Sequence, residues 1–346
     1  MKAALFTKYQ APITIEKVPD PDLLIDGVII EVKATGICRS DWHGWMGHDS
    51  DVQLPHVPGH ELAGEVVAVG KTVRNWQKGD RVTLPFCCGC GYCPQCASGQ
   101  QQVCDNYFQP GFTAWGSFAE YVHIRYADVN CVRMKESMSY EETAILGCRF
   151  VTAYRGIVAQ GKLQPGQWLA VHGCGGVGLS AIMIGHAIGA RVIAVDLEEE
   201  KLAFAKSLGA NVVLNAQAVD DIPSAIKEIT KGGVAVSIDA LGSQTTCINS
   251  VLSLQKRGKH IQIGLMTGPH ATPPIPMGPV ISNELEIIGS HGMQGHQYPA
   301  MLDLILAKQI PLKKMIGKEL DLTAGAAALM EMDAFKNTGV MVINQF

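Results

Sequence analysis

Charged residues are scarce in this chain, and neither sign predominates. Lys and Arg number 28 and Asp and Glu 32 among 346 residues, which gives a formal net charge of −4. Without an excess of basic residues to neutralise phosphates, nucleic-acid binding is not expected. Aromatic residues are also few, at 6%, whereas 47% of the residues are hydrophobic and 37 are glycine. This composition favours an α/β protein with a sizeable core and many tight turns, and the length predicts two domains.

Signs of secretion are absent as well. The N-terminal sequence MKAALFTKYQ lacks the apolar region of a signal peptide. The cysteines number 11, and an odd count argues against a disulfide framework. Crowded thiols in such a chain are typical of metal binding. We therefore expect a cytoplasmic protein that uses its cysteines as metal ligands.

One uncharged stretch could be mistaken for a membrane span. No Asp, Glu, Lys or Arg occurs between Trp168 and Ala190, which is long enough to cross a bilayer. The same stretch contains six glycines and two histidines. A strand, a glycine turn and a helix explain it better, so no membrane association is expected.

The segment from Gly36 to Gly64 concentrates metal-binding side chains. It contains the thiol of Cys38, the imidazole of His60 and the carboxylate of Glu61. Such soft and borderline ligands suit Zn²⁺. An isolated cysteine on an apolar stretch is usually just buried, but Cys148 would be the third protein ligand that this segment lacks. Between Cys38 and His60 lie further polar side chains: Ser40, Asp41 and His43.

Residues 85–104 form a cysteine-rich lobe. Four of its thiols have the spacing C-x₂-C-x₂-C-x₇-C: Cys90, Cys93, Cys96 and Cys104. Four thiolates at short spacing can enclose one tetrahedral ion and leave no open position, which is typical of a structural zinc site. The alternative run Cys87-x₂-Cys90-x₂-Cys93-Pro94 partly imitates an iron–sulfur motif, but its fourth cysteine falls at x₂ rather than x₃. Zinc is favoured, with Cys87 and Cys88 as non-ligands.

After Gly166, short apolar runs alternate with helical patterns. Six strands are predicted: Trp168–His172, Arg191–Val195, Asn211–Leu214, Val234–Asp239, His260–Gly264 and Leu285–Gly289. Helices between them indicate a doubly wound parallel sheet. The first strand is followed by a G-x-G-x-x-G turn, whose cofactor-binding candidates are Gly173, Gly175, Gly176, Val177 and Gly178.

This glycine turn predicts a dinucleotide site. Glycines let the backbone approach a pyrophosphate at the N-terminus of the following helix, where the dipole and free N–H groups favour an anion. Asp196 closes the second strand, 18 positions past the last glycine of the turn. Its carboxylate suits two ribose hydroxyls and would repel a 2′-phosphate, so NAD is predicted rather than NADP.

The remaining sequence indicates a second domain of different architecture. Residues 1–35 alternate short apolar runs with Pro and Asp turns, typical of an antiparallel, barrel-like region. A strand pattern returns at Gly111–Ile124, and a last strand is predicted at Val340–Asn344. We therefore expect a catalytic domain of residues 1–149 and 291–346 and a nucleotide-binding domain of residues 150–290.

One motif resembles a known family signature. The pattern Gly59-His60-Glu61-x₂-Gly64-x₅-Gly70-x₂-Val73 is similar to that of zinc-containing alcohol dehydrogenases in the medium-chain dehydrogenase/reductase superfamily, and the resemblance extends over essentially the whole chain. It implies a GroES-like β-barrel catalytic domain plus a Rossmann domain. It also implies NAD, two zincs per subunit, and reversible oxidation of a primary or secondary alcohol to an aldehyde or ketone.

The resemblance also implies roles for single residues. Cys38, His60 and Cys148 would hold the catalytic zinc, with the fourth position left for water or substrate, and Glu61 would lie beside the metal. Asp41 would orient a ligand histidine. The remaining implied roles are proton transfer for Ser40 and His43, pyrophosphate contact for Arg39, nicotinamide packing for Thr152 and proximity to the adenosine ribose for Lys201.

Two positions depart from the family pattern. Val340 follows Gly339 where relatives often carry a phosphate-binding Arg or Lys, and Trp115 stands where Asp is common. With Trp42 and Trp45, Trp115 suggests an aromatic pocket, although Trp more often serves packing. A polyol or amino-alcohol dehydrogenase is the alternative enzyme, and a non-catalytic zinc or redox-sensor protein is the alternative class. The chain length resembles that of microbial tetrameric members, so a homotetramer is expected.

Overall fold

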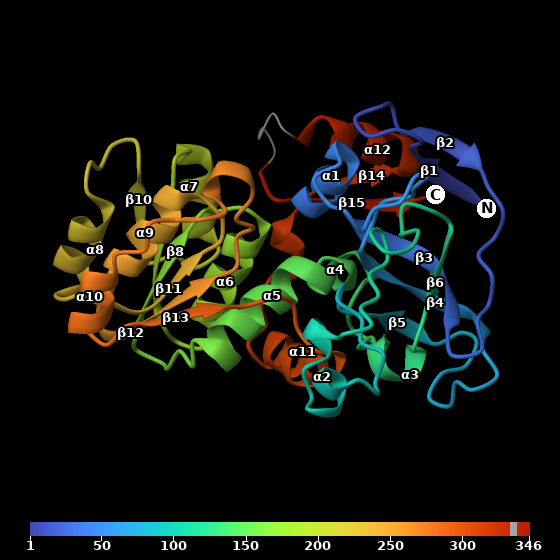
Figure 1. Ribbon diagram of the computed structural model, residues 1–346, viewed down its shortest axis with the longest axis horizontal. Helices are drawn as coiled ribbons and strands as arrows, with labels where there is room; N and C mark the ends of the chain where they lie inside the picture. Colours follow the sequence, from blue (N-terminus) through green and yellow to red (C-terminus); the bar gives the residue numbers. More distant parts are fainter. Residues whose placement is uncertain (333–337) are drawn as a thin grey trace. The chain divides into compact units, whose positions relative to one another are not determined.

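The chain forms two compact units. The computed structural model describes residues 1–332 and 338–346. The first unit comprises Met1–Val151, Gly292–Ile305 and Pro311–Phe346, and the second comprises Thr152–His291 and Leu306–Ile310. Residues 306–310 were expected in the first unit. Figure 1 shows both units, with most of their strands and helices labelled.

The first unit is built on a seven-stranded sheet. Its strands run in the order β14-β15-β3-β4-β5-β7, and β6 pairs with β3. The pairs are antiparallel apart from β14–β15, which is parallel. A separate antiparallel pair is formed by β1 and β2. The bounds are β1 Lys2–Leu5, β2 Thr14–Lys17, β3 Val28–Gly36, β4 Glu61–Val69, β5 Arg81–Thr83, β6 Tyr121–Ile124, β7 Val132–Arg133, β14 Ile316–Asp321 and β15 Val340–Gln345. Of the strand pattern expected at Gly111–Ile124, only β6 forms a strand.

The pairing of β3 with β4 determines where the candidate ligands lie. Alternate residues of β3, namely Val28, Ile30 and Val32, are buried in one apolar cluster. Since the side-chain period of a strand is two, this burial specifies the register of the strand. The register sets Gly36 opposite Glu61. The last residues of β3 therefore lie beside the first residues of β4.

Helices in the first unit begin at defined caps. Helix α1 (Arg39–Met46) starts with a capping box between Cys38 and Asp41 and ends at Gly47, whose φ of 81° suits glycine. Helix α4 (Tyr140–Ala144) likewise starts with a capping box, between Ser139 and Glu142. The remaining α-helices are α2 Pro94–Ala97, α3 Ala127–Asn130, α12 Leu322–Met330 and α11 Tyr298–Ala307, of which the last two residues belong to the second unit.

The second unit contains the predicted parallel sheet. Its six strands run in the order β10-β9-β8-β11-β12-β13, and every pair is parallel. The strands are β8 Trp168–His172, β9 Arg191–Asp196, β10 Val212–Asn215, β11 Val234–Asp239, β12 Leu254–Gln262 and β13 Glu286–Gly289. The chain order reverses between β8 and β11, and ligands bind at such a switch point outside the carboxyl ends of the strands.

Helices connect the strands of this sheet. They are α6 Gly176–Ala187, α7 Glu199–Ser207, α8 Ile222–Thr230, α9 Gln244–Leu252 and α10 Met277–Ser282. The largest difference from the predicted strand bounds is at β12, which begins at Leu254 rather than His260. Helix α5 (Val151–Tyr154) is followed by a π-helical turn at Arg155–Gln160.

The uncharged stretch around the glycine turn folds as predicted, into β8, a turn and α6. Within the described ranges, no helix combines the length and the apolar character needed to cross a membrane.

Candidate active site

Three segments of the first unit bring metal-binding atoms together. Cys38 follows β3, His60 precedes β4, and Cys148 lies on a π-helical turn (Leu146–Phe150) after α4. With Glu61, each residue offers one ligand atom, and these atoms all lie within 4.8 Å of one another. Residues more than eighty positions apart therefore form one donor set.

His60 shows that this donor set fits a metal. Its ring is fully buried, and its Nδ1 lies 2.7 Å from Oδ1 of Asp41. Its Nε2 is buried without a hydrogen-bond partner. A buried polar atom without a partner is costly, and a ligand imidazole usually donates its other N–H to a carboxylate. Two sulfurs and this nitrogen are the donor chemistry that zinc takes.

Asp41 organises two of the three segments. Its Oδ1 accepts from the Gly59 amide at 3.0 Å as well as from His60, and its Oδ2 accepts from the Cys38 amide at 3.0 Å. The carboxylate is 1% exposed. Although burial opposes protonation, the charge of Asp41 raises the pKa of His60 well above its ordinary value. A hydrogen bond from Cys148 holds the pKa of Cys38 well below its ordinary value. Asp41 thus favours positive charge at His60, and Cys148 favours the thiolate form of Cys38.

A buried ion pair that the sequence analysis missed lies against this site. The guanidinium of Arg149 bonds both carboxylate oxygens of Glu61, with Nη2 2.6 Å from Oε2 and Nε 2.9 Å from Oε1. Arg149 is 5% exposed and Glu61 is fully buried. The sequence does indicate a buried pair here, because Arg149 is a charged residue in the apolar stretch AILGCRFVTAY. Charged residues are almost never buried unless they are paired.

Two phenylalanines border His60 and were also not predicted. The rings of Phe86 and Phe112 meet the imidazole edge-on, at centroid distances of 6.0 and 5.4 Å. Their apolar rings exclude water from this side of the donor set. No ligand or motif spacing in the sequence distinguishes them from core residues.

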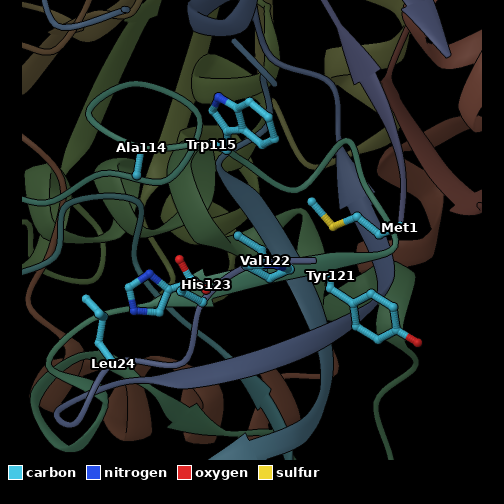
Figure 2. A pocket seen from close by; sticks show the side chains of 9 residues that line it. Met1, Leu24, Ala114, Trp115, Tyr121, Val122 and His123 are labelled. Atoms are coloured by element: carbon cyan, nitrogen blue, oxygen red, sulfur yellow. The ribbon is translucent and has the colours of Figure 1, made fainter. Parts of the chain in front are cut away.

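The tryptophans expected to form an aromatic pocket are used for packing. Trp42 and Trp45 are buried in one apolar cluster, and Trp115 packs against it. The indole N–H of Trp45 donates to the Ala11 carbonyl, and that of Trp115 donates to the Pro55 carbonyl. Trp115 also borders a surface cavity of about 230 Å³, whose other lining residues are Met1, Pro21, Asp22, Leu24, Ala114, Tyr121, Val122 and His123 (Figure 2).

Helix α1 carries the residues expected to move protons and bind phosphate. The Oγ of Ser40 lies 3.8 Å from the sulfur of Cys38. His43, one turn further along, is within hydrogen-bond distance of His48, with 3.0 Å between their Nδ1 atoms. The guanidinium of Arg39 lies 3.7 Å from the centroid of the Trp42 ring and donates to the Met332 carbonyl.

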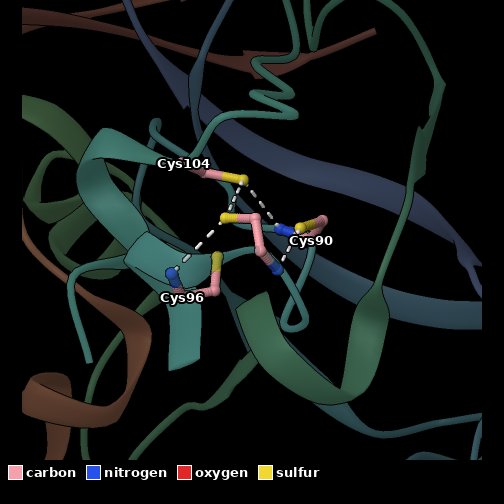
Figure 3. Close-up of side chains that lie close together, drawn as sticks. Cys90, Cys96 and Cys104 are labelled. Atoms are coloured by element: carbon pink, nitrogen blue, oxygen red, sulfur yellow. Dashed lines mark hydrogen bonds between the residues drawn. The ribbon is translucent and has the colours of Figure 1, made fainter. Parts of the chain in front are cut away.

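The cysteine lobe forms a second, closed donor set. The sulfurs of its four predicted cysteines lie within 4.8 Å of one another (Figure 3). Backbone amides point at these sulfurs, for example from Cys90 to Cys104 at 3.2 Å. Cys87 instead clusters with Phe86 and Cys148, and its thiol bonds the Met293 carbonyl. Because Cys87 lies outside this set, the structure does not favour the iron–sulfur alternative.

Hydrogen bonds favour the thiolate form of one lobe cysteine, Cys90. Burial opposes ionisation of Cys90, but hydrogen bonds from the amides of Tyr92 and Cys93 and from Asn106 lower its pKa to about 6. A thiolate is the form that binds zinc. At neutral pH the lobe therefore contains at least one thiolate that can bind zinc.

The second unit forms the expected dinucleotide turn. Gly173 has a φ of 97°, and a Cβ on Gly178 would lie 1.8 Å from the Gly173 carbonyl oxygen, so both positions require glycine. Asp196 accepts hydrogen bonds from the amides of Cys174 at 2.6 Å and Leu197 at 2.8 Å. Its carboxylate is thus fixed beside the turn. Thr152 is buried in α5, and Lys201 lies in α7.

Comparisons with known proteins agree with this geometry. A family model described as alcohol dehydrogenase GroES-like domain matches residues 25–136, and one described as zinc-binding dehydrogenase matches residues 176–307. An alcohol dehydrogenase of Geobacillus stearothermophilus is 36% identical over 293 residues, 84% of each chain. The chain belongs to the zinc-containing alcohol dehydrogenases.

Other members of the family cover the whole chain. An NAD-dependent alcohol dehydrogenase of Sulfurisphaera tokodaii is 34% identical over 361 residues, 99% of each chain. A sorbitol dehydrogenase of Bacillus subtilis is 32% identical and covers 99% of this chain and 96% of its own. The solved alcohol dehydrogenase from Thermus sp. ATN1 has a TM-score of 0.91 at 27% identity, with 100% of both chains covered. The predicted combination of GroES-like and Rossmann folds is confirmed.

In this zinc-containing alcohol dehydrogenase, Val340 belongs to the core of the first unit. It begins β15, pairs with Ile316 and is 1% exposed. Where relatives were expected to present a cation, this chain adds an apolar side chain to the core.

Proposed function

We propose that this chain oxidises a primary or secondary alcohol to the aldehyde or ketone, reversibly, with NAD as hydride acceptor. The observation that carries the proposal is the set of Cys38, His60 and Cys148, in which Nε2 of His60 is buried without a hydrogen-bond partner. Three protein ligands with an open position are typical of catalytic zinc, whereas structural sites are closed by four. When bound, zinc polarises the substrate oxygen and lowers the pKa of its hydroxyl.

Metal content tests this function against a non-catalytic zinc or redox-sensor protein. We expect two zincs per chain, of which one is readily chelated with loss of activity and the other is released only on unfolding. The four-cysteine lobe is the closed set that would retain its ion. A single zinc that can be stripped without loss of activity would contradict the proposal.

Ser40 and His43 are the proposed path for the alcohol proton. The Ser40 hydroxyl lies beside a ligand sulfur, and His43 lies one helical turn further on, toward exposed His48. An imidazole can pass protons to solvent near neutral pH. We expect His43→Ala to slow alcohol oxidation more at neutral than at alkaline pH, where solvent accepts the proton directly. An unchanged pH profile would remove His43 from this path.

The second unit would bind the NAD. Its glycine turn approaches the N-terminus of α6, where a pyrophosphate is favoured. Asp196 is held by backbone amides for contact with two ribose hydroxyls, and exposed Leu197 follows it instead of a cation. We further propose that Arg39 contacts the pyrophosphate, Lys201 lies near the adenosine ribose and Thr152 packs on the nicotinamide. A kcat/KM that favoured NADP over NAD would contradict the role of Asp196.

The substrate is proposed to be a largely apolar alcohol. Phe86 and Phe112 place apolar rings against His60, where the hydroxyls of a polyol would find no hydrogen-bond partners. The 32% identical sorbitol dehydrogenase favours the second candidate, a polyol or amino-alcohol dehydrogenase. A panel of aliphatic, aromatic, polyol and amino alcohols, followed by NADH absorbance, separates the two. A kcat/KM highest for sorbitol or an amino alcohol would support the second candidate.

A cytoplasmic homotetramer is proposed for the assembled enzyme. Strand β13 pairs only with β12 among the described strands, and its Ile287 is 42% exposed. Nearby on α10, Ile281 is 75% exposed and Met277 is 52% exposed. Exposed apolar groups beside an open sheet edge are typical of an interface. Light scattering measures the mass, and a monomeric mass would contradict this proposal.

A further inference from the structure

We propose that Arg149 is a positioning residue that holds the Glu61 carboxylate off the metal and so keeps the fourth coordination position open. This inference rests on the proposed function. It concerns a group that does not touch the substrate and that no motif in the sequence assigns.

Arg149 engages both oxygens of Glu61. Its Nε lies 2.9 Å and its backbone amide 3.3 Å from Oε1, while its Nη2 lies 2.6 Å from Oε2. Bidentate guanidinium–carboxylate pairs are directional as well as strong, because two parallel bonds fix the plane of the carboxylate. With both groups buried, no water competes for these bonds.

The same network reaches all three ligand-bearing segments. Arg149 directly follows the ligand Cys148, and Glu61 directly follows the ligand His60. The Nη2 of Arg149 also donates to the carbonyl of Ile37 at 2.9 Å, and Ile37 directly precedes the ligand Cys38. One guanidinium therefore connects the chain neighbours of every candidate zinc ligand.

Glycines beside Glu61 leave room for the carboxylate in this orientation. A Cβ on Gly36 would lie 2.3 Å from Oε2 of Glu61, so the absence of a side chain at Gly36 makes space for it. A Cβ on Gly147 would lie 3.3 Å from the Cα of Glu61. The register that pairs Gly36 with Glu61 thus places the carboxylate within reach of Arg149.

Without this restraint, Glu61 could close the site. It offers an oxygen within 4.8 Å of the donor atoms of Cys38, His60 and Cys148. A carboxylate is a competent zinc ligand, and a fourth protein ligand converts an open site into a closed one. By binding both oxygens, Arg149 makes the carboxylate a poor competitor for the position that substrate needs.

The test uses binding of an added ligand to the cobalt-substituted holoenzyme, followed by its visible absorption. Imidazole is the probe, since it enters an open position without turnover. We expect Arg149→Met to weaken imidazole binding by about tenfold or more, because the freed Glu61 competes for the metal. The double variant E61Q/R149M should restore the affinity to within about threefold of the wild type, because a neutral amide competes poorly.

Two further variants keep the test decisive if Arg149→Met does not fold. Arg149→Lys retains the charge but can hold only one oxygen at a time, so we expect a smaller loss of imidazole affinity that Glu61→Gln again reverses. Arg133→Met removes the bidentate partner of Asp80 elsewhere in the first unit. This matched control should lower stability and leave imidazole binding unchanged.

The outcomes separate this inference from the proposed function. If the wild type turns over and binds imidazole but every Arg149 variant binds it equally well, the inference is wrong and the function stands. Failure of Glu61→Gln to restore binding would also overturn the inference, because the loss would then not come from the carboxylate. If the wild-type cobalt protein neither binds imidazole nor oxidises any alcohol, the proposed function itself fails.

Discussion

The first unit holds two donor sets of similar size but opposite construction. The lobe takes four sulfurs from Cys90 to Cys104, and most of its supporting hydrogen bonds come from backbone amides of the same loop. The other set takes two sulfurs and one nitrogen from three distant segments, and its support is made of buried charges, namely Asp41 and the Glu61–Arg149 pair.

Under the proposed function, this difference separates a metal that would fold a loop from a metal that would do chemistry. A local set of four thiolates can close around its ion, so the binding free energy becomes folding free energy. A set assembled by the sheet is already held in place by the core, and it can leave one position free. We propose that the buried charges around the second set orient its ligands and leave the fourth position of the metal free.

The largest effect is expected from a substitution that disrupts the closed donor set. Cys104→Ser takes one sulfur from the lobe, and we expect zinc content to fall from about two to about one per chain. The free energy of unfolding should fall by about 5 kcal/mol, since the lobe folds around its ion. Metal analysis and denaturant unfolding measure both quantities. Cys131→Ala, at a buried thiol outside both sets, should retain both zincs; equal zinc content in the two variants would contradict the closed set.

The next largest effect is expected from a substitution that removes one ligand of the open donor set. Cys148→Ala should lower kcat/KM for alcohol oxidation by about 10³-fold or more, equivalent to about 4 kcal/mol, while the lobe keeps its zinc. Steady-state kinetics with metal analysis provide the measurement. The control is Cys87→Ala, a buried thiol in the same cluster that should retain most activity. Comparable activity in the Cys148 variant would show that the open set is not the catalytic one.

A smaller effect is expected from the support of the open set. Asp41→Asn replaces a carboxylate that accepts bonds from His60, Gly59 and Cys38. We expect zinc affinity at this site to fall by about 10- to 100-fold and the lobe zinc to be unaffected. Competition with a chelator measures the affinity. Asp49→Asn, at a half-buried carboxylate outside both donor sets, serves as control, and unchanged chelator competition in Asp41→Asn would contradict the orienting role.

The smallest effect is expected from an ion pair in the same unit that lies outside both donor sets. Arg133 bonds both oxygens of Asp80 at 2.6 and 3.1 Å, and these hydrogen bonds hold the pKa of Asp80 below its ordinary value. The pair therefore stabilises the fold above pH of about 4, and this contribution is lost as the pH falls through the lowered pKa. Asp80→Asn should cost about 1–2 kcal/mol at pH 7 and progressively less in acid.

Urea unfolding of wild type and Asp80→Asn over a range of pH checks this last prediction. A difference that stays constant from pH 7 down into acid would mean that the charge of Asp80 makes no contribution. The measurement also gives a reference for the free energy of unfolding, since one ion pair is expected to contribute less than the metal in either donor set.

The two sets differ in how far the sequence could predict them. The lobe could be predicted as a unit, because its ligands are close in sequence and their spacing limits the geometry. The glycine turn was equally accessible, since Gly173 and Gly178 are required by local backbone conformation. For the open set, residue type and family resemblance named Cys38, His60 and Cys148, but nothing local shows that they meet.

What the sequence alone determined is therefore the chemistry of the ligands and the alternation that builds each sheet. Only the tertiary structure decided that Arg149 bonds Glu61, that Phe86 and Phe112 border His60, and that Trp115 packs outside this site. The physical reason is that these contacts join segments far apart along the chain. Their geometry follows from strand register and core packing, which no short spacing encodes.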